Sequence, residues 1–277
     1  MGSETESRRA VNVKKRDKKR SGNDRNRYTN KRSFSILLVA FVLLAATILG
    51  AVTFDNDSNN NGTGPDESYL AADTSWNGLA TPITEGDGTQ ALPYEISTPG
   101  HLKFLSERVM LNDTFWNPSS NPKYYILTED IVLNDLTYVK VWGEGFAPRN
   151  KWIPIGTDLN ASSVEAPFYG HFDGNGKVVS GIYISVSGVG GNNQGLFGLV
   201  DRGTISNVGI DQSYIRGYTY VGGVVGEIRN NGVISNCYNK GTVVGDRVGG
   251  VAGFVDGSSM INCYNTGHIK TVAALGT

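Results

Sequence analysis

A block of the form Gly-x-x-Gly recurs three times in the last third of the chain, and its spacing constrains the fold more than any other feature. The blocks lie at Gly195–Gly198, Gly223–Gly226 and Gly250–Gly253, so 28 and 27 residues separate their first glycines. A matching segment follows each block and reads ISNV, ISNC and MINC in turn. A repeat of roughly 20 to 50 residues indicates stacked units, because one unit cannot bury its apolar face alone. We therefore predict a solenoid.

The second repeat shows how each unit is expected to fold. Strand-forming residues occupy 220–225, 233–237 and 242–244, and turn residues separate them at 230–232 and 239–241. Three short strands in each coil are typical of a parallel β-helix, in which each strand pairs with its equivalent one coil along. The fold class is therefore all-β.

The residues that recur with the repeat have expected structural roles. The glycines fit where a side chain would block the next coil or where the chain turns a corner, and asparagines at equivalent turns stack into ladders. The recurring residues are Gly195, Gly198, Gly223, Gly226, Gly250, Gly253, Asn207, Asn236 and Asn262.

The two cysteines, Cys237 and Cys263, fall at the same point of successive repeats. Stacked coils place equivalent residues about 4.8 Å apart, which lies within the Cα separation of a disulfide. We expect a pair of stacked thiols that fill an inward position, with a disulfide as the alternative. Neither cysteine has a second Cys or a His at ligand spacing, so no metal site is predicted.

The amino-terminal part differs in character from the rest. Residues 1–33 carry 12 Lys and Arg against 4 Asp and Glu, whereas the remainder carries 13 against 22. Residues 34–54 follow as an uncharged apolar run, long enough to cross the roughly 30 Å core of a bilayer as a helix. The cations before it place the amino terminus in the cytoplasm and the rest outside. The run is either a retained transmembrane anchor or a long signal segment that is cleaved to give a secreted protein.

The basic tail at 1–33 is expected to set topology and to attract anionic lipid. A nucleic-acid partner is not expected, because Tyr28 is the only aromatic residue among its cations. Residues 55–67 contain no apolar side chain and read as a polar linker. The folded ectodomain is then 68–277.

A helical cap is expected near the start of the ectodomain. A short strand at 94–97 precedes Thr98, a plausible N-cap, and Pro99 stands at the first helical position. Three apolar residues that follow share one helical face: Leu102, Leu105 and Val109. A solenoid needs such a cap because its terminal coil otherwise exposes core and strand edges.

These residues together resemble the GLUG-motif family of bacterial surface proteins, named for the Gly-Leu-x-Gly element seen at Gly195–Gly198. The resemblance covers about 76–271, with the repeats at 192–271. The lead-in segments occur in the family's order: GTQALPYEISTPGHLKFLS, YYILTEDIVL, WIPIGT, FYGHFDGNGKVVSGIYI and NQGLFGLV. The resemblance implies a right-handed parallel β-helix at the cell surface, with roles in attachment or scaffolding, and it supplies no catalytic residue.

Two departures from the family pattern are visible. Val224 and Val251 replace the motif leucine, which is a tolerable apolar exchange. The chain also stops at Thr277 after three repeats without an evident cap. An uncapped coil invites self-association, and a truncated fragment of a larger surface protein is the alternative.

The sequence contains no recognised catalytic motif. The sequence lacks HExxH, GxSxG and GGxGxD elements. Its carboxylates and histidines form no constellation that would place two acids across a groove, as a glycosidase needs. The residues considered are Glu129, Asp130, Asp135, Asp173, Asp211, Asp246, Asp256, His101, His171 and His268. We predict no catalytic residue, metal or cofactor.

Aromatic residues are the better indication of function. Trp116 and Trp142 lie in loop-like stretches, and exposed Trp is favoured at sugar-binding platforms and interfaces. We therefore expect a non-catalytic surface solenoid that serves adhesion, binding of a host or envelope glycan or protein, or envelope scaffolding. A carbohydrate-active β-helix enzyme, a polysaccharide lyase or glycoside hydrolase, is the alternative.

The predicted topology can be checked on whole cells that produce the full chain. Protease added outside should remove the ectodomain while the basic tail at 1–33 stays protected. Antibodies against both parts follow the products on a blot. Full protection of the ectodomain in intact cells, with cleavage after lysis, would overturn the assignment.

Overall fold

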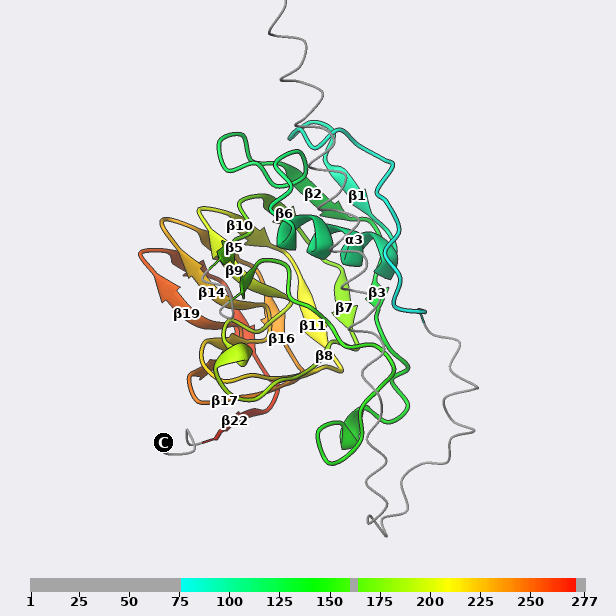
Figure 1. Cartoon of the computed structure of the whole chain (residues 1–277), viewed down its shortest axis with the longest axis vertical. Helices are drawn as coiled ribbons and strands as arrows, with labels where there is room; N and C mark the ends of the chain where they lie inside the picture. Colours follow the sequence, from blue (N-terminus) through cyan, green and yellow to red (C-terminus); the bar gives the residue numbers. More distant parts are fainter. Residues whose placement is uncertain (1–75, 160–163, 273–277) are drawn as a thin grey trace, which may run out of the picture. The chain divides into compact units, whose positions relative to one another are not determined.

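The chain winds into a right-handed parallel β-solenoid of about six coils (Figure 1). The structure is a computed structural model that describes residues 76–159 and 164–272. The all-β solenoid class is therefore confirmed. The basic tail at 1–33, the apolar run at 34–54 and the linker at 55–67 lie outside the described residues. Within the described ranges, no helix combines the length and the apolar character that crossing a membrane requires.

Four parallel sheets form the sides of the solenoid, and each adds one strand per coil. Sheet 1 contains β1 (Tyr94–Ile96), β2 (Tyr124–Leu127), β6 (His171–Asp173), β10 (Thr204–Ser206), β15 (Val233–Ser235) and β20 (Ser259–Ile261). Sheet 2 contains β3 (Ile131–Val132), β7 (Val178–Ser180), β11 (Gly209–Asp211), β16 (Tyr238–Asn239) and β21 (Tyr264–Asn265). Sheet 3 contains β8 (Tyr183–Ser185), β12 (Tyr214–Arg216), β17 (Thr242–Gly245) and β22 (Ile269–Thr271). Sheet 4 contains β9 (Phe197–Asp201), β14 (Val225–Arg229) and β19 (Ala252–Asp256).

The repeats contain more strands than the sequence predicted. The second one has five: β13 (Val221–Gly222), which pairs with β18 (Val248–Gly249), and then β14, β15, β16 and β17. The expected strand at 220–225 is split between β13 and β14, and the expected turn at 239–241 begins inside β16. Asn239 lies in β16 and not in the expected turn. Its side chain forms hydrogen bonds across the corner that follows: its Nδ2 donates to Gly241 O at 3.2 Å, and Gly241 N donates to its Oδ1 at 3.0 Å.

In-register stacking builds the core. On sheet 1, Phe172 pairs with Ile205 and Ile205 with Ile234, and all three side chains are fully buried. On sheet 3, Ile215 pairs with Val243 in the same way. Because side chains alternate between the two faces of a strand, the residues on either side of these positions point outward and form rows along the stacking direction.

A helix caps the amino-terminal end as predicted. Helix α3 (Pro99–Met110) begins after Thr98, whose side chain accepts a hydrogen bond from His101 N at 3.2 Å. Its apolar face belongs to the same buried cluster as the solenoid core, and the fully buried residues on it are Leu102, Leu105 and Val109.

An insertion between β3 and β6 departs from the regular coils. It contains the short helix η1 (Val139–Val141) and the antiparallel pair β4 (Thr157–Leu159) and β5 (Val164–Ala166). A second short helix, η2 (Val189–Gly191), lies between β8 and β9. Arg229 on sheet 4 holds the insertion: its guanidinium donates to Glu165 Oε2 at 2.5 Å and to Asp201 Oδ2 at 3.2 Å.

The second glycine of each Gly-x-x-Gly block lies where two backbones approach closely. A Cβ on Gly198 would lie 2.1 Å from Gly156 O, and one on Gly226 would lie 2.5 Å from the carbonyl carbon of Asn193. A Cβ on Gly253 would lie 2.4 Å from the carbonyl carbon of Tyr220. Backbone atoms cannot move aside as the end of a flexible side chain can. Only glycine therefore fits at these three positions, where the backbones of neighbouring segments lie close together.

Gly226→Ala should therefore destabilise the solenoid by about 1–3 kcal/mol, the usual cost of overpacking a dense interior. Gly190→Ala is the matched control, because a Cβ there meets nothing within 4 Å. Urea unfolding of the full chain, followed by circular dichroism, measures both midpoints. Equal midpoints for the two variants would contradict the close-approach assignment.

Candidate functional site

The repeated asparagines form a ladder beside sheet 1. Asn207, Asn236 and Asn262 have φ angles of 54°, 53° and 53°, a left-handed conformation that asparagine adopts more readily than most residues. Asn236 Nδ2 donates to Asn207 Oδ1 at 3.0 Å, and Asn262 Nδ2 donates to Asn236 Oδ1 at 3.4 Å. Asn207 Nδ2 in turn donates to Asp173 Oδ1 at 2.9 Å. The left-handed turn conformation and the hydrogen bonds of the ladder explain why asparagine recurs at these positions.

A second asparagine ladder lies inside the coil and was missed from the sequence. Asn239 is fully buried, and its Nδ2 donates to Asn265 Oδ1 at 2.8 Å. A Cβ on Gly223 or Gly250 would lie 2.4 or 2.3 Å from the Cγ of the asparagine that faces it. The first glycines of the last two blocks therefore make room for this ladder. The recurring Tyr-Asn-x-Gly segment was the signal available in the sequence.

The two tryptophans chosen as contact residues are less accessible than expected. Trp116 is half-buried among three aromatic rings, at 4.5 Å from Tyr94, 4.9 Å from Phe104 and 5.4 Å from Phe115. Trp142 is only 2% exposed. Its loop position suggested an exposed ring, and that expectation was wrong because the loop folds back onto sheet 3.

The cysteines occupy stacked positions as free thiols, with Cys237 buried and Cys263 half-buried. Burial raises the pKa of the Cys237 thiol to about 12. The thiol is therefore protonated at neutral pH and unsuited to nucleophilic chemistry. Among the described residues, no group of three or more His, Cys, Asp or Glu side chains is placed to hold a metal ion.

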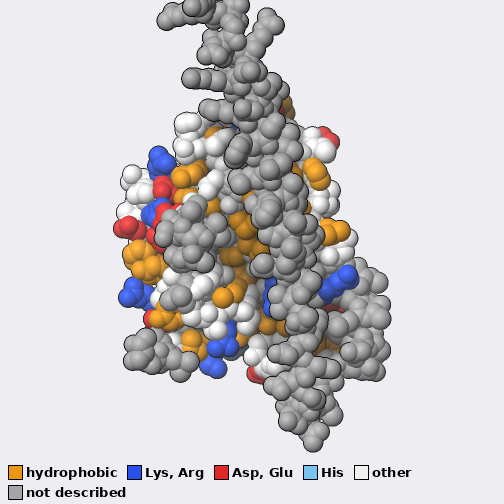
Figure 2. Space-filling model, in the orientation of Figure 1, with side chains coloured by type: hydrophobic (Ala, Val, Ile, Leu, Met, Phe, Trp, Pro, Cys, Tyr) orange, Lys and Arg blue, Asp and Glu red, His pale blue; other side chains and the backbone are white. Residues whose placement is uncertain are grey.

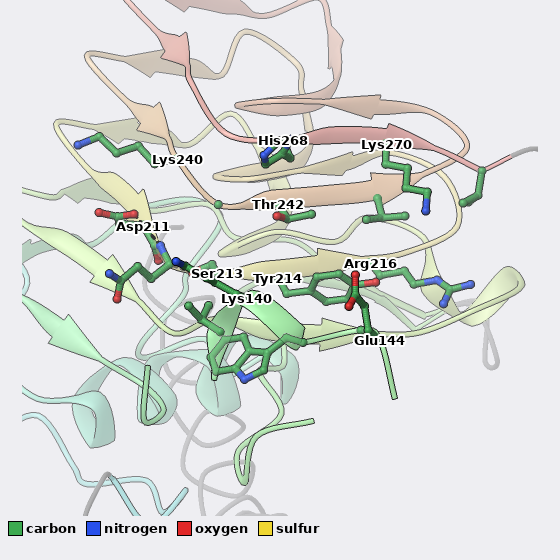
Figure 3. Close-up of a pocket in the computed structure, with 17 residues that line it drawn as sticks. Lys140, Glu144, Asp211, Ser213, Tyr214, Arg216, Lys240, Thr242, His268 and Lys270 are labelled. Atoms are coloured by element: carbon green, nitrogen blue, oxygen red, sulfur yellow. Dashed lines mark hydrogen bonds between the residues drawn. The ribbon is translucent and has the colours of Figure 1, made fainter. Parts of the chain in front are cut away.

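A groove of about 620 Å³ runs along the outer face of sheet 3 (Figure 3). Strands β12, β17 and β22 form its floor, and the loop 139–144 forms a wall. Gly143 in this loop packs against the ring of Tyr214, where a Cβ would lie 2.2 Å from Cζ. Trp142 packs behind it, edge-on to Tyr183 at 5.7 Å between ring centroids. The insertion thus converts one side of the solenoid into a concave surface.

Two rows of outward side chains line the floor, because the strands stack in register. Tyr214 pairs with Thr242, and His268 follows on the next coil. Arg216 pairs with Val244, and Val244 pairs with Lys270. Figure 3 shows these side chains on successive strands of one face. The floor therefore repeats along the stacking direction rather than converging on one point.

The groove is lined by more cationic than anionic side chains. Its four cationic residues are Lys140, Arg216, Lys240 and Lys270, against the carboxylates Glu144 and Asp211. None of the four belongs to a salt bridge within the described ranges. Burial raises the pKa of Tyr214, which stays a neutral phenol. Elsewhere, Figure 2 shows hydrophobic and charged side chains interspersed on the face in view.

Sequence reasoning considered Asp211 and His268 but did not connect them, and it missed Lys140, Glu144, Tyr214, Arg216 and Lys270. Cationic residues at matching places two repeats apart, as in Arg216 and Lys270, were the available signal. The loop that closes the groove lies outside the repeat, so the repeat spacing carried no information about it.

A smaller hollow lies on the outer face of sheet 1. His171 stacks on Tyr124 at 4.4 Å, and its Nδ1 lies 2.9 Å from Thr204 Oγ1. Asp173 instead accepts from the amide of Asn175 at 2.8 Å and from Asn207. Because the two residues have different partners, they do not form an acid–base pair in this structure.

The last described coil leaves its inward side chains uncovered by any described residue. Met260 pairs with Ile234 and is 50% exposed, and Ile269 pairs with Val243 and is 47% exposed, although both partners are fully buried. Val255 pairs with the buried Ile228 and is 37% exposed. The strands β19 to β22 each stand at the end of their sheets. The end opposite α3 is therefore an apolar face with strand edges.

Comparison with known proteins identifies the repeats. Residues 217–244 and 245–272 match the GLUG motif, so the resemblance drawn from the sequence is confirmed for two tandem repeats. The block at Gly195–Gly198 lies outside these matches, but its strand β9 stacks on β14 in register.

Two further proteins resemble the chain. Halomucin from Haloquadratum walsbyi (strain DSM 16790 / HBSQ001) is 32% identical over 185 residues, which are 65% of this chain. The chain spans about 2% of the length of that relative. A crystal structure of a candidate immunoglobulin A1 protease from Bacteroides ovatus is 22% identical with a TM-score of 0.45, and the match covers 66% of this chain and 49% of that chain.

Proposed function

Starting from a solenoid whose last two coils are GLUG motifs, we propose that this chain is a non-catalytic surface protein that binds a ligand along the groove on sheet 3. Adhesion and envelope scaffolding are the forms that such binding would take. The observation that carries the proposal is the groove itself, where in-register strands present rows of polar and cationic side chains beside a loop that closes one wall. A repeating floor suits an extended ligand better than a compact one.

A surface location accompanies this proposal. The similarity to Halomucin supports a surface protein. The apolar run at 34–54 would anchor the chain with its amino terminus in the cytoplasm, or would direct secretion if cleaved. A bacterial source and a single membrane span are predictions from the sequence.

A carbohydrate-active enzyme is the second candidate, favoured by one observation. Glu144 and Asp211 line the same groove, from the loop and from β11 respectively. Hydrolysis of a glycosidic bond requires two carboxyl groups across the bond. The two candidate functions predict different fates for a bound glycan. A binding protein leaves the length of the glycan unchanged, whereas an enzyme shortens it.

An array of glycans and matrix proteins, probed with the full chain, tests the proposal. Thr242→Trp should abolish binding because the indole fills the groove floor. Val233→Trp is the matched control, since Val233 is also a half-buried, β-branched strand residue but faces outward on sheet 1. Captured glycans should keep their length. Release of new reducing ends that Glu144→Gln abolishes would establish the enzyme instead.

Two results would contradict the groove as a binding site. One is the absence of any binding above background by a chain with an intact β-type circular dichroism spectrum. The other is equal binding by Thr242→Trp and Val233→Trp.

We also propose that the exposed apolar face at the last coil pairs with a second copy of the chain. Helix α3 covers the other end of the core, so the two copies would meet last coil to last coil about a two-fold axis. Such an interface is isologous, with the same patch on both subunits. It would bury Met260, Ile269 and Val255 and would supply partners for the edge strands.

Chemical cross-linking of the full chain in detergent measures this pairing. Met260→Lys should lower the dimer yield at least tenfold, because it places a charge in the buried face. Ile261→Lys is the control: Ile261 is equally exposed at 51% but continues an outward row beyond Ser235. A dimer yield that Met260→Lys leaves unchanged would refute the interface.

A further inference from the structure

We propose that the groove on sheet 3 takes an anionic polysaccharide, a polymer whose sugar rings carry carboxylate groups. This inference rests on the proposed function and adds the chemical class of the ligand.

The groove concentrates positive charge within an acidic domain. The described ranges hold 13 Lys and Arg against 17 Asp and Glu, whereas the groove holds four cations against two acids. Lys140, Lys240 and Lys270 are exposed and lack a carboxylate partner among the described residues. Cations without a carboxylate partner in a concave site attract anions, and the attraction is strongest at low ionic strength.

The spacing of the cations suits a polymer with a charge on each repeating unit. Arg216 and Lys270 occupy one outward row and are two coils apart, with Val244 between them. At a strand spacing of about 4.8 Å, their Cα atoms are separated by roughly 9 to 10 Å. Two linked pyranose rings have a comparable length, so carboxylates on alternate rings of the polymer would meet Arg216 and Lys270.

The remaining groups of the groove suit sugar hydroxyls. Thr242 and Tyr214 offer hydroxyl groups between the cations, and Glu144 and Asp211 are acceptors for hydroxyl donors. The same two carboxylates would repel any polyanion, so they favour a polymer whose charges are separated by hydroxyl groups over a nucleic-acid backbone, which carries one charge at every phosphate. An acidic peptide would supply few hydroxyl donors. The mixture of cations, hydroxyls and acids therefore favours an acidic sugar polymer over other polyanions.

The size of the groove also suits a sugar polymer. The groove volume of about 620 Å³ lies within the usual range for ligand sites and holds several sugar units at a time.

Binding of the full chain to polygalacturonate tests the inference. The comparison probes are its carboxyl-reduced neutral form, polyglutamate and single-stranded DNA, each of similar chain length. We expect polygalacturonate to bind best and its neutral form at least tenfold more weakly. The double variant Lys140→Gln with Lys270→Gln should bind polygalacturonate at least tenfold more weakly than the unchanged chain. Lys151→Gln with Lys177→Gln removes the same charge outside the groove and should leave the affinity within twofold.

Three outcomes would overturn the ligand class: equal binding of the neutral form, binding of polyglutamate or DNA as tight as that of polygalacturonate, or equal effects of the two double variants. If the neutral polymer binds and Thr242→Trp still blocks it, the ligand class is wrong while the groove remains the binding site. If no polymer binds and no array probe does, the proposed function fails as well. Shortening of polygalacturonate would support the ligand class and replace the binding protein with an enzyme.

Discussion

The pairing of each strand with its equivalent one coil along is the interaction on which the rest of this structure depends. It aligns identical positions of successive repeats, so that an inward isoleucine meets another and an outward arginine stands in line with a lysine. Gly226 and its equivalents permit the close backbone approach that this pairing requires. The buried ladder from Asn239 to Asn265 satisfies polar groups that burial would otherwise penalise.

The same register explains how a structural repeat produces a binding surface. A single coil contributes only two or three outward side chains to sheet 3, but stacked coils turn them into rows. The insertion before β6 then adds what the repeat cannot, a wall that includes Trp142 and Glu144. Regular stacking therefore supplies the floor of the groove, and an irregular segment supplies its concavity.

The sequence predicted the elements that depend on periodicity and local chemistry. The coil spacing, the Thr98 cap with Pro99, and the asparagine ladder at the turns all follow from residues close together in the chain or from the repeat. Prediction from the sequence failed where segments that are distant in the chain pack together. Trp142 was judged exposed because its neighbours read as a loop, and nothing local shows that this loop folds over Tyr183. Asn239 was judged a turn residue, although stacking buries it.

Methyl NOE spectroscopy of the full chain measures the in-register stacking most directly. The inward row of sheet 3 places Val243 between Ile215 and Ile269. We predict NOEs that join the methyl groups of Val243 to those of both isoleucines, and none between the two isoleucines, which are two coils apart. If assigned Val243 methyl groups show no contact with either isoleucine, the coils do not stack in this register and the rows that line the groove do not exist.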